Sequence, residues 1–308
     1  MGNASIHGEI IPEMEERFSS EKKWKKFIKK FSIKPVISEK ESEIVKKLKD
    51  LVVNAVKQNI PQERFGILFS GGVDSSLIAK ICKDNKKDFI CYTSIFEEKG
   101  LKQAEDLEYA KKIAKKFGFK LKIVKANLKQ TEKYIKEILK IIKEPNVVKV
   151  GVALPFYIAF EAAKKDRINI MFSGLGSEEL FAGYKRHTKV TDINKECFNG
   201  LIAMYERDIT RDLAIAKSKG IKLKIPYLDE NIISYSLRIP AKMKFNGKNN
   251  KIAIRKVAEK LGLGEFSWRK KRAAQYGSRF DKAIDKLTRK KGFKYKKEYL
   301  ESVFRGLK

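Results

Sequence analysis

The sequence has 308 residues, with 69 Lys or Arg against 38 Asp or Glu, so its formal net charge is +31. Hydrophobic residues make up 43% of the chain, which is enough to bury a core and excludes a wholly disordered protein. The longest apolar runs are far shorter than about 18 residues, which excludes a membrane-spanning helix, and the start of the chain, 1–4, lacks the charged and apolar blocks of a secretory signal.

Cysteine and histidine are scarce. The three cysteines, Cys82, Cys91 and Cys197, form no close pair, which argues against a disulfide scaffold, a zinc ribbon and a Cys-x-x-Cys redox site. The two histidines, His7 and His187, are too few for a site with several histidine ligands. A reducing cytoplasm is therefore the expected location.

The N-terminal residues 1–38 are expected to form a basic arm. Within it, 21–31 reads EKKWKKFIKKF, and its apolar residues recur at the spacing of one helical stripe: Trp24, Phe27, Ile28 and Phe31. One interpretation is a helix that docks this stripe on the main body. The other is a helix that contacts a membrane surface or RNA through its lysines.

From residue 39 the chain alternates between helical and strand-like segments. Short apolar runs predict buried strands at 65–70, 89–96, 120–124 and 168–172, and the segments between them predict helices at 75–83, 104–117, 132–142 and 154–164. Strands separated by helices of this length indicate a doubly wound parallel α/β sheet. After about residue 195 the pattern becomes mostly helical, and we assign 39–268 to one domain.

The last forty residues, 269–308, form a basic tail with 15 Lys or Arg against four acidic residues. Aromatic residues are interleaved with the basic ones. Such a pattern can grip nucleic acid through phosphate contacts and base stacking. It can equally be a helix that packs its rings on the body while its lysines face water. The net charge of the whole chain leaves the same two interpretations open: a solvated surface, or a polyanionic partner such as RNA.

The strongest local signal is the segment SGGVDSS, which lies between a predicted strand and a predicted helix. Glycines let the backbone turn tightly and bring its N–H groups close to an anion, and the following helix N-terminus adds unpaired donors. Asp74 in the middle of such a loop implies that Mg²⁺ lies between its carboxylate and the phosphates. The segment has no Gly-Lys-Ser/Thr, so it is not a Walker A loop.

SGGVDSS resembles the pyrophosphate-binding loop of the PP-loop ATP pyrophosphatases. Members of that superfamily cleave ATP between its α and β phosphates and adenylate an acceptor. Further motifs follow in order. FSGLGSEELFAGYKRH at 172–187, IPYLD at 225–229, Ile239-Pro240 with Lys244, and KIAIRKVA at 251–258 resemble motifs of class B asparagine synthetase and of β-lactam synthetase. The resemblance covers roughly residues 65–275.

The resemblance implies a role for each matching residue. The loop residues Ser70, Gly71, Gly72, Ser75 and Ser76 would hold the β,γ-pyrophosphate of ATP, and Asp74 and Glu178 would bind Mg²⁺. The backbone at Ser94, Ile95 and Phe96 would meet adenine, and Gly174 and Gly176 would line the ribose and acceptor pocket.

Two further residues carry chemical roles by the same resemblance. Glu144 would assist proton transfer, and Lys244 would stabilise charge on the pentavalent phosphorus and the departing pyrophosphate. Alternatively, each is an ordinary surface residue.

The sequence departs from the asparagine synthetase pattern at several positions. Position 2 is Gly2 instead of the catalytic cysteine, and only about 60 residues precede the loop, so we expect no glutamine hydrolysis by that route. Ammonia would be free or would come from a separate glutaminase subunit. On the acceptor side, Glu178 replaces Asp, Leu175 replaces Glu, and Val147 stands where an Asp is expected, which weakens the case for aspartate as the acceptor.

The expected function is an asparagine synthetase-like ligase that uses ATP and Mg²⁺. It would activate a carboxylate, aspartate being the first candidate, as an acyl-adenylate, and transfer ammonia or another amine with release of AMP and pyrophosphate. Two alternatives stay open. One is an RNA-modifying PP-loop enzyme that adenylates a base, and the other is a nucleotide-binding protein without turnover.

Overall fold

A computed structural model describes residues 16–31, 35–270 and 273–307 of the chain. Its centre is one parallel sheet with the strand order β3-β2-β1-β4-β5. The strands are β1 Phe65–Leu68, β2 Phe89–Phe96, β3 Leu121–Ala126, β4 Ile170–Phe172 and β5 Lys222–Lys224. The strand order reverses at β1, so β1 and β4 flank the position where ligands bind in open α/β sheets.

Helices cover both faces of the sheet, because alternate side chains of each central strand point to opposite sides. Phe65 and Ile67 of β1 face a first core, whereas Leu68 and Tyr92 face a second. The first core is covered mainly by α3 Glu41–Asn59, α4 Val73–Asp84, α5 Glu105–Phe117 and α12 Ile252–Lys260, and the second by α6 Leu128–Ile142, α7 Val147–Lys165 and α10 Thr210–Ser218. This arrangement confirms the doubly wound α/β fold.

The remaining elements are short and lie mostly after β4. They are α8 Ser177–Leu180, η1 Lys185–Lys189, α9 Ile193–Met204, η2 Tyr205–Ile209, η3 Pro226–Leu228, α11 Glu230–Ser236, η4 Ala241–Met243, η5 Gly264–Trp268 and α13 Ala274–Gly277. The η2 segment is a single π-helical stretch between α9 and α10. The mostly helical character expected after residue 195 is confirmed, apart from the three-residue strand β5.

The amphipathic helix of the N-terminal arm is docked on the body. It is α2, Glu21–Lys29, and the Ser20 side chain caps it by accepting the N–H of Lys23 at 3.2 Å. Trp24 is fully buried, and its Nε1 donates to the carbonyl of Leu201 on α9 at 2.7 Å. The docking interpretation is confirmed, because the apolar stripe is occupied by the protein itself. The first 15 residues of the arm lie outside the described residues.

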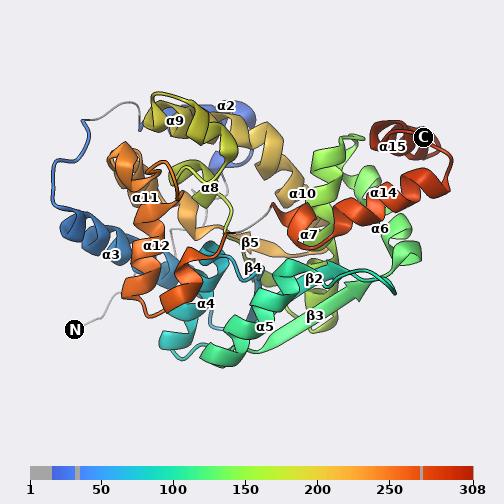
Figure 1. The fold of residues 1–308 in the computed structure, drawn as a ribbon, viewed down its shortest axis with the longest axis horizontal. Helices are drawn as coiled ribbons and strands as arrows, with labels where there is room; N and C mark the ends of the chain where they lie inside the picture. Colours follow the sequence, from blue (N-terminus) through green and yellow to red (C-terminus); the bar gives the residue numbers. More distant parts are fainter. Residues whose placement is uncertain (1–15, 32–34, 271–272, 308) are drawn as a thin grey trace, which may run out of the picture.

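The basic tail also packs on the body. It forms α14 Phe280–Lys290 and α15 Lys296–Arg305, which lie beside α6 and α7 at the end of the molecule opposite α3 and α11 (Figure 1). Phe280, Leu287 and Tyr299 are buried in the second core. Most of the tail's aromatic rings therefore serve packing, as the second interpretation of this segment predicted.

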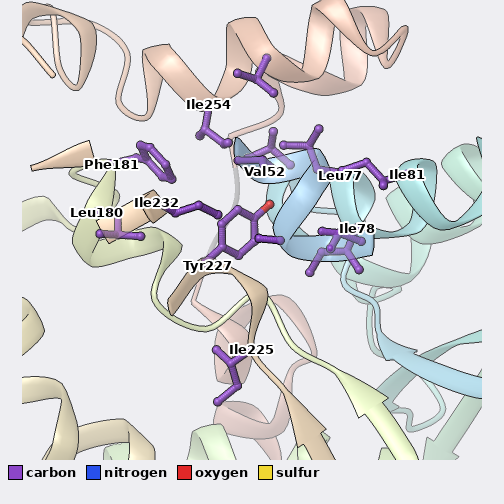
Figure 2. Packing of buried hydrophobic residues seen from close by; sticks show 14 of the residues in the cluster. Val52, Leu77, Ile78, Ile81, Leu180, Phe181, Ile225, Tyr227, Ile232 and Ile254 are labelled. Carbon is purple, nitrogen blue, oxygen red and sulfur yellow. The ribbon is translucent and has the colours of Figure 1, made fainter. Parts of the chain in front are cut away.

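Close packing continues up to the phosphate loop. Tyr227 of η3 lies among aliphatic side chains from several elements, including Val52 of α3, Leu77 of α4 and Ile254 of α12 (Figure 2). Its hydroxyl donates to the carbonyl of Asp74 at 3.0 Å. The first core thereby fixes the start of α4, where the predicted site begins.

Among the described helices none is by itself long and apolar enough to cross a membrane. Only α6 and α7 counted together reach the required length and composition, and a bend of 110° separates them.

Candidate active site

The predicted phosphate loop follows β1 directly and ends in α4. Gly71 has a φ of +65°, and a Cβ at this position would lie 2.9 Å from the backbone nitrogen of Ala110. Glycine is required here both by the left-handed backbone and by the close approach of α5. The loop turns sharply at the carboxyl end of the sheet, and α4 begins at Val73 with its free N–H groups directed at the turn.

Several serine hydroxyl groups lie around this loop. Ser75 Oγ donates to the carbonyl of Gly72 at 3.2 Å. The hydroxyls of Ser76 and Ser94 are buried and have no hydrogen-bond partner among the described residues. Buried polar groups are nearly always satisfied in folded proteins, so these two hydroxyls indicate a bound ligand or water.

Arg269 holds the loop in place through a hydrogen bond to Ser70. The sequence analysis assigned this residue only to the basic tail. Its side chain is 1% exposed, and its Nη2 contacts Asp106 Oδ1 at 2.7 Å. Its Nη1 donates to the carbonyl of Ser70, and its guanidinium stacks on the ring of Tyr109 at 4.2 Å. A buried arginine that binds both the loop backbone and a carboxylate in this way fixes the loop geometry. Isolated basic residues in a basic segment carry no signal that could have revealed it.

Asp74 and Glu178 are joined by a lysine. Lys251 Nζ lies 2.8 Å from Asp74 Oδ2 and 2.9 Å from Glu178 Oε1, and its side chain is 4% exposed. Asp74 also accepts a hydrogen bond from Ser177 Oγ. Burial lowers the pKa of the Lys251 ammonium, but Asp74 and Glu178 outweigh that effect, so the net pKa is raised and the group stays charged.

The two carboxylates converge as the metal prediction requires. Their oxygens lie within 2.9 Å of one nitrogen atom, and hard carboxylate oxygens are the ligands that Mg²⁺ prefers. The donor chemistry therefore fits Mg²⁺, whereas the point between the carboxylates is held by the Lys251 ammonium. The described residues contain no cluster of three or more His, Cys, Asp or Glu that could hold a metal ion. The other ligands would have to be phosphate oxygens and water.

A cavity of about 500 Å³ opens beside the loop. Its wall includes seven predicted site residues, from the ends of β1, β2 and β4: Ser70, Asp74, Ser75, Ser94, Gly174, Gly176 and Glu178. The α7 residues Val148, Val152 and Phe156 form an apolar wall, and Gln275 and Ser278 close one side. The volume and mixed lining are typical of a small-molecule site.

A second cavity of about 290 Å³ lies on the other side of Lys251. It shares Asp74, Glu178 and Tyr184 with the first cavity. Five basic residues line it: Lys248, Lys251, Arg255, Arg269 and Lys270. Such a lining favours an anion, so the two cavities flank the bridged carboxylates with different chemistry.

A series of acidic and basic residues from α8, η2 and α10 forms part of the wall of the first cavity. Glu179 of α8 pairs with Arg207 of η2, Arg207 with Asp208, and Arg211 of α10 with both Asp208 and Asp212. Burial raises the pKa of Glu179 to about 8, with Asp208 adding to the rise and Arg207 opposing it. Burial also raises the pKa of Asp212 to about 6.

Two buried carboxyl oxygens in this series of residues accept no hydrogen bond from the described residues. Glu179 Oε2 and Asp212 Oδ2 have no hydrogen-bond partner among the described residues. Sequence reasoning named Glu179 only as one of two paired carboxylates and missed Asp208, Arg211 and Asp212. Their spacing along one helical face is common on protein surfaces, so it gave no signal.

Comparison with known proteins identifies the family. The model of the asparagine synthase family matches residues 47–196 and 188–301. The chain belongs to the asparagine synthase family. A putative asparagine synthetase [glutamine-hydrolyzing] of Methanocaldococcus jannaschii is 31% identical over 285 residues, which cover 80% of this chain and 52% of that protein.

More distant relatives give the same result for the asparagine synthase family. Asparagine synthetase B of Escherichia coli is 25% identical, with 78% of this chain and 45% of that protein covered. The human asparagine synthetase is 29% identical, with 75% and 43% covered. The chain thus spans about half the length of the curated relatives it matches. Among solved structures, an NH3-dependent NAD synthetase of Campylobacter jejuni aligns at 15% identity and a TM-score of 0.39, covering 87% of this chain and 95% of that one.

Several residues that the asparagine synthetase motifs singled out do not line either cavity. Lys244 is fully buried, and its Nζ has no nitrogen or oxygen partner among the described residues. Burial lowers its pKa, while the nearby thiol of Cys197 acts in the opposite direction. This position does not bring the ammonium to the phosphate loop, because the motif spacing places residue 244 after η4 but does not determine which way its side chain points.

Glu144 does not line the first cavity but contacts a residue that does. Its Oε2 contacts Lys149 Nζ at 2.5 Å, and Lys149 lines the cavity. Of the three residues whose backbone is predicted to meet adenine, Ser94 lines the cavity, and the side chains of Ile95 and Phe96 are buried in the cores. The contact with adenine stays a prediction. Gly71, Gly72 and Ser76 belong to the loop but do not line the cavity wall.

Proposed function

We propose that the protein is an ATP-dependent, AMP-forming carbon–nitrogen ligase of asparagine synthetase type. The observation that carries the proposal is the loop at Ser70–Ser76, which opens at the strand-order reversal onto a cavity of about 500 Å³. A nucleotide and a small acceptor fit within that volume. Membership of the asparagine synthase family supports the same chemistry.

The loop and the second cavity would bind the phosphates of ATP. Backbone N–H groups at the start of α4 and the hydroxyl of Ser76 would donate to phosphate oxygens, and Ser75 Oγ would do so once it leaves the carbonyl of Gly72. Asp74 and Glu178 would hold Mg²⁺, which would supply positive charge beside the phosphates. Lys248, Arg255 and Lys270 line the second cavity and can stabilise the departing pyrophosphate, a role that their position supports better than that of Lys244.

The acceptor would lie between α7 and the charged wall of the cavity. A carboxylate oxygen of the acceptor attacks the α-phosphorus of ATP, pyrophosphate leaves, and an amine then attacks the acyl carbon and releases AMP. The amine must lose a proton in that step. Glu144 would take part through Lys149, its partner at the cavity wall. Gly174 and Gly176, which line the cavity, would lie beside the ribose.

Aspartate and ammonia are the first substrates to test, which would place the protein in asparagine biosynthesis. The charged wall offers both cations for a carboxylate and unpartnered buried carboxylate oxygens for an ammonium group. The curated relatives are named glutamine-hydrolyzing. We propose that ammonia reaches this site either free or from a separate glutaminase subunit. The three unpaired cysteines are consistent with a cytoplasmic location.

The proposal is tested by pyrophosphate release from Mg-ATP with aspartate, with aspartate plus ammonium, and with total tRNA. We expect release with aspartate, and asparagine once ammonium is added. Asp74→Asn should lower kcat/KM by about 100-fold or more because it removes charge beside the phosphates. Asp285→Asn is the matched control, since Asp285 lies on the distant α14 and pairs with Lys296 of α15.

Other outcomes would replace the proposal. Release that depends on tRNA alone would identify an RNA-modifying enzyme, which the charge of +31 keeps as the second candidate. Nucleotide binding without release for any acceptor in a wider carboxylate screen would identify a protein without turnover.

A further inference from the structure

Lys251 occupies a position that its backbone fixes. It is the residue before α12, with a φ of +59°, and its side chain is buried between two carboxylates from α4 and α8. Packing around it is tight: a Cβ on Gly183 would lie 2.5 Å from Lys251 Cε and 1.6 Å from Glu178 Oε2. The side chain is therefore closely packed in its position between the carboxylates, and Gly183 leaves the space that it occupies.

A divalent cation bound by both carboxylates would need the same point. Carboxylate oxygens bind Mg²⁺ or Mn²⁺ at about 2.1 Å, with the metal between them. The Lys251 ammonium already lies between Asp74 Oδ2 and Glu178 Oε1, at 2.8 and 2.9 Å. Two cations cannot share this position, because electrostatic repulsion and contact distance both oppose it. The metal ion and the Lys251 ammonium must therefore occupy this position at different times.

Room for the alternative position exists. Lys251 lines the second cavity together with four other basic residues. An ammonium that left the carboxylates in that direction would enter a cationic space, which is unfavourable without an anion. A bound triphosphate supplies that anion, so the displacement becomes favourable only when nucleotide is present.

We propose that in the nucleotide-free protein the Lys251 ammonium occupies the point between Asp74 and Glu178 and excludes divalent metal from that point until nucleotide binds. The metal then enters with the nucleotide, and the ammonium turns to the phosphates. The second half of this inference rests on the proposed function, whereas the exclusion of metal from the free protein does not.

The test is a titration with Mn²⁺, followed by electron paramagnetic resonance, in the absence of nucleotide and acceptor. Lys251→Met keeps the length of the side chain and removes its charge. We expect this variant to bind Mn²⁺ about tenfold more tightly than the wild type, because no ammonium then occupies the point between Asp74 Oδ2 and Glu178 Oε1. Lys260→Met is the matched control, an exposed lysine on the same helix, and should match the wild type.

Two further variants complete the design. Adding Asp74→Asn to Lys251→Met should abolish the gain. In the wild-type background, Asp74→Asn should leave the weak Mn²⁺ binding unchanged, and this comparison does not depend on whether Lys251→Met folds. Tight Mn²⁺ binding by the free wild type that Asp74→Asn removes would overturn the proposal. Equal binding by the wild type and a folded Lys251→Met variant would overturn it as well.

The outcome is independent of the ligase assay. No ATP or acceptor is present in the Mn²⁺ titration, so a failure of metal exclusion leaves pyrophosphate release to be judged by itself. A protein that releases no pyrophosphate can still show the predicted difference between Lys251→Met and the wild type.

Discussion

At the scale of single residues, close contacts with neighbouring backbone restrict which side chains the site can accept. Gly71 faces the backbone of α5 so closely that a methyl group would lie 2.9 Å from the nitrogen of Ala110. Backbone atoms cannot move aside as the end of a flexible side chain can. The loop must therefore shift to accept any larger residue, and the phosphate-binding N–H groups shift with it.

We predict that Gly71→Ala raises the KM for ATP by about 10- to 100-fold, since a misplacement of about 1 Å has effects of that size. The left-handed backbone should add a stability cost of about 1–2 kcal/mol. Pyrophosphate release at varied ATP concentration, together with urea denaturation, measures both effects.

The control for this prediction is Gly292→Ala. Gly292 also has a positive φ, of +78°, but its added Cβ would meet no atom within 4 Å. It should lose a similar amount of stability while keeping the wild-type KM. Equal KM values for both alanine variants would contradict the role we give to the approach of α5.

The sequence predicted the local structure of the loop, a tight glycine turn followed by a helix start, because both are local features. The roles of the loop residues and of Asp74 stay predictions. Lys251 and Arg255 stood in a recognised motif without a role, since their partners Asp74 and Ser267 lie far from them or past the next turn. Lys244 shows the converse: a motif fixed its position, and the fold directed its side chain into the interior.

At the scale of elements, the charged wall of the cavity joins α8, η2 and α10. Each of these elements contributes at least one buried ionisable group, and the contacts run between them without interruption from Glu179 to Asp212. The π-helical stretch η2 brings Arg207 and Asp208 into this series at the junction of two helices, as such stretches often do at functional sites.

This wall should make stability depend on pH in a defined direction. The pKa of Glu179 is raised from 4.5 to about 8. Between these values the folded protein holds a proton that the unfolded chain has released, so the free energy of unfolding falls as pH rises. The slope from one such group is at most about 1.4 kcal/mol per pH unit.

Glu179→Gln removes the titrating group while keeping its shape. Urea unfolding at a series of pH values from about 5 to 8 should show a shallower loss of stability for this variant than for the wild type. Glu137→Gln, an exposed substitution on α6, should follow the wild type. Parallel profiles for Glu179→Gln and the wild type would show that Glu179 is already ionised across this range.

Elements with a strong apolar pattern were predicted well, and weak ones were missed. The four predicted strands, β1 to β4, and α2 have apolar runs or stripes, and the structure places each of them at the predicted position, with bounds that differ by at most two residues. The strand β5 reads only Lys-Leu-Lys, and nothing in those three residues indicates a strand. It forms because the edge of β4 offers it a parallel partner, from Ile170 opposite Lys222 to Phe172 opposite Lys224. That partner is known only from the fold.

At the scale of the whole molecule, the described parts of both the N-terminal arm and the basic tail contribute to the cores. Trp24 from the N-terminal arm belongs to the first core, and Phe280, Leu287, Tyr299 and Leu300 from the tail belong to the second. The tail is thus a structural part of the body, whatever its charge contributes on the outside.

We predict that a chain ending at residue 268 fails to form the native fold. Loss of α14 and α15 would expose the faces of α6 and α7 that they cover, and each large buried side chain contributes roughly 1.5–3 kcal/mol. Circular dichroism and soluble yield of the shortened chain, compared with the full chain, measure this. A shortened chain with a native spectrum and cooperative melting would contradict the prediction and leave the tail available as a separate RNA-binding segment.

The position of Gln275 and Ser278 in the cavity wall has a consequence for how the protein is made. Ribosomes deliver the chain from its N-terminus, and domains begin to fold during synthesis. The phosphate loop emerges about two hundred residues before the segment that closes the cavity. The growing chain therefore carries its loop without a complete cavity until Ser278 has been added, and a nucleotide bound there, as we propose, would stabilise the protein only after that point.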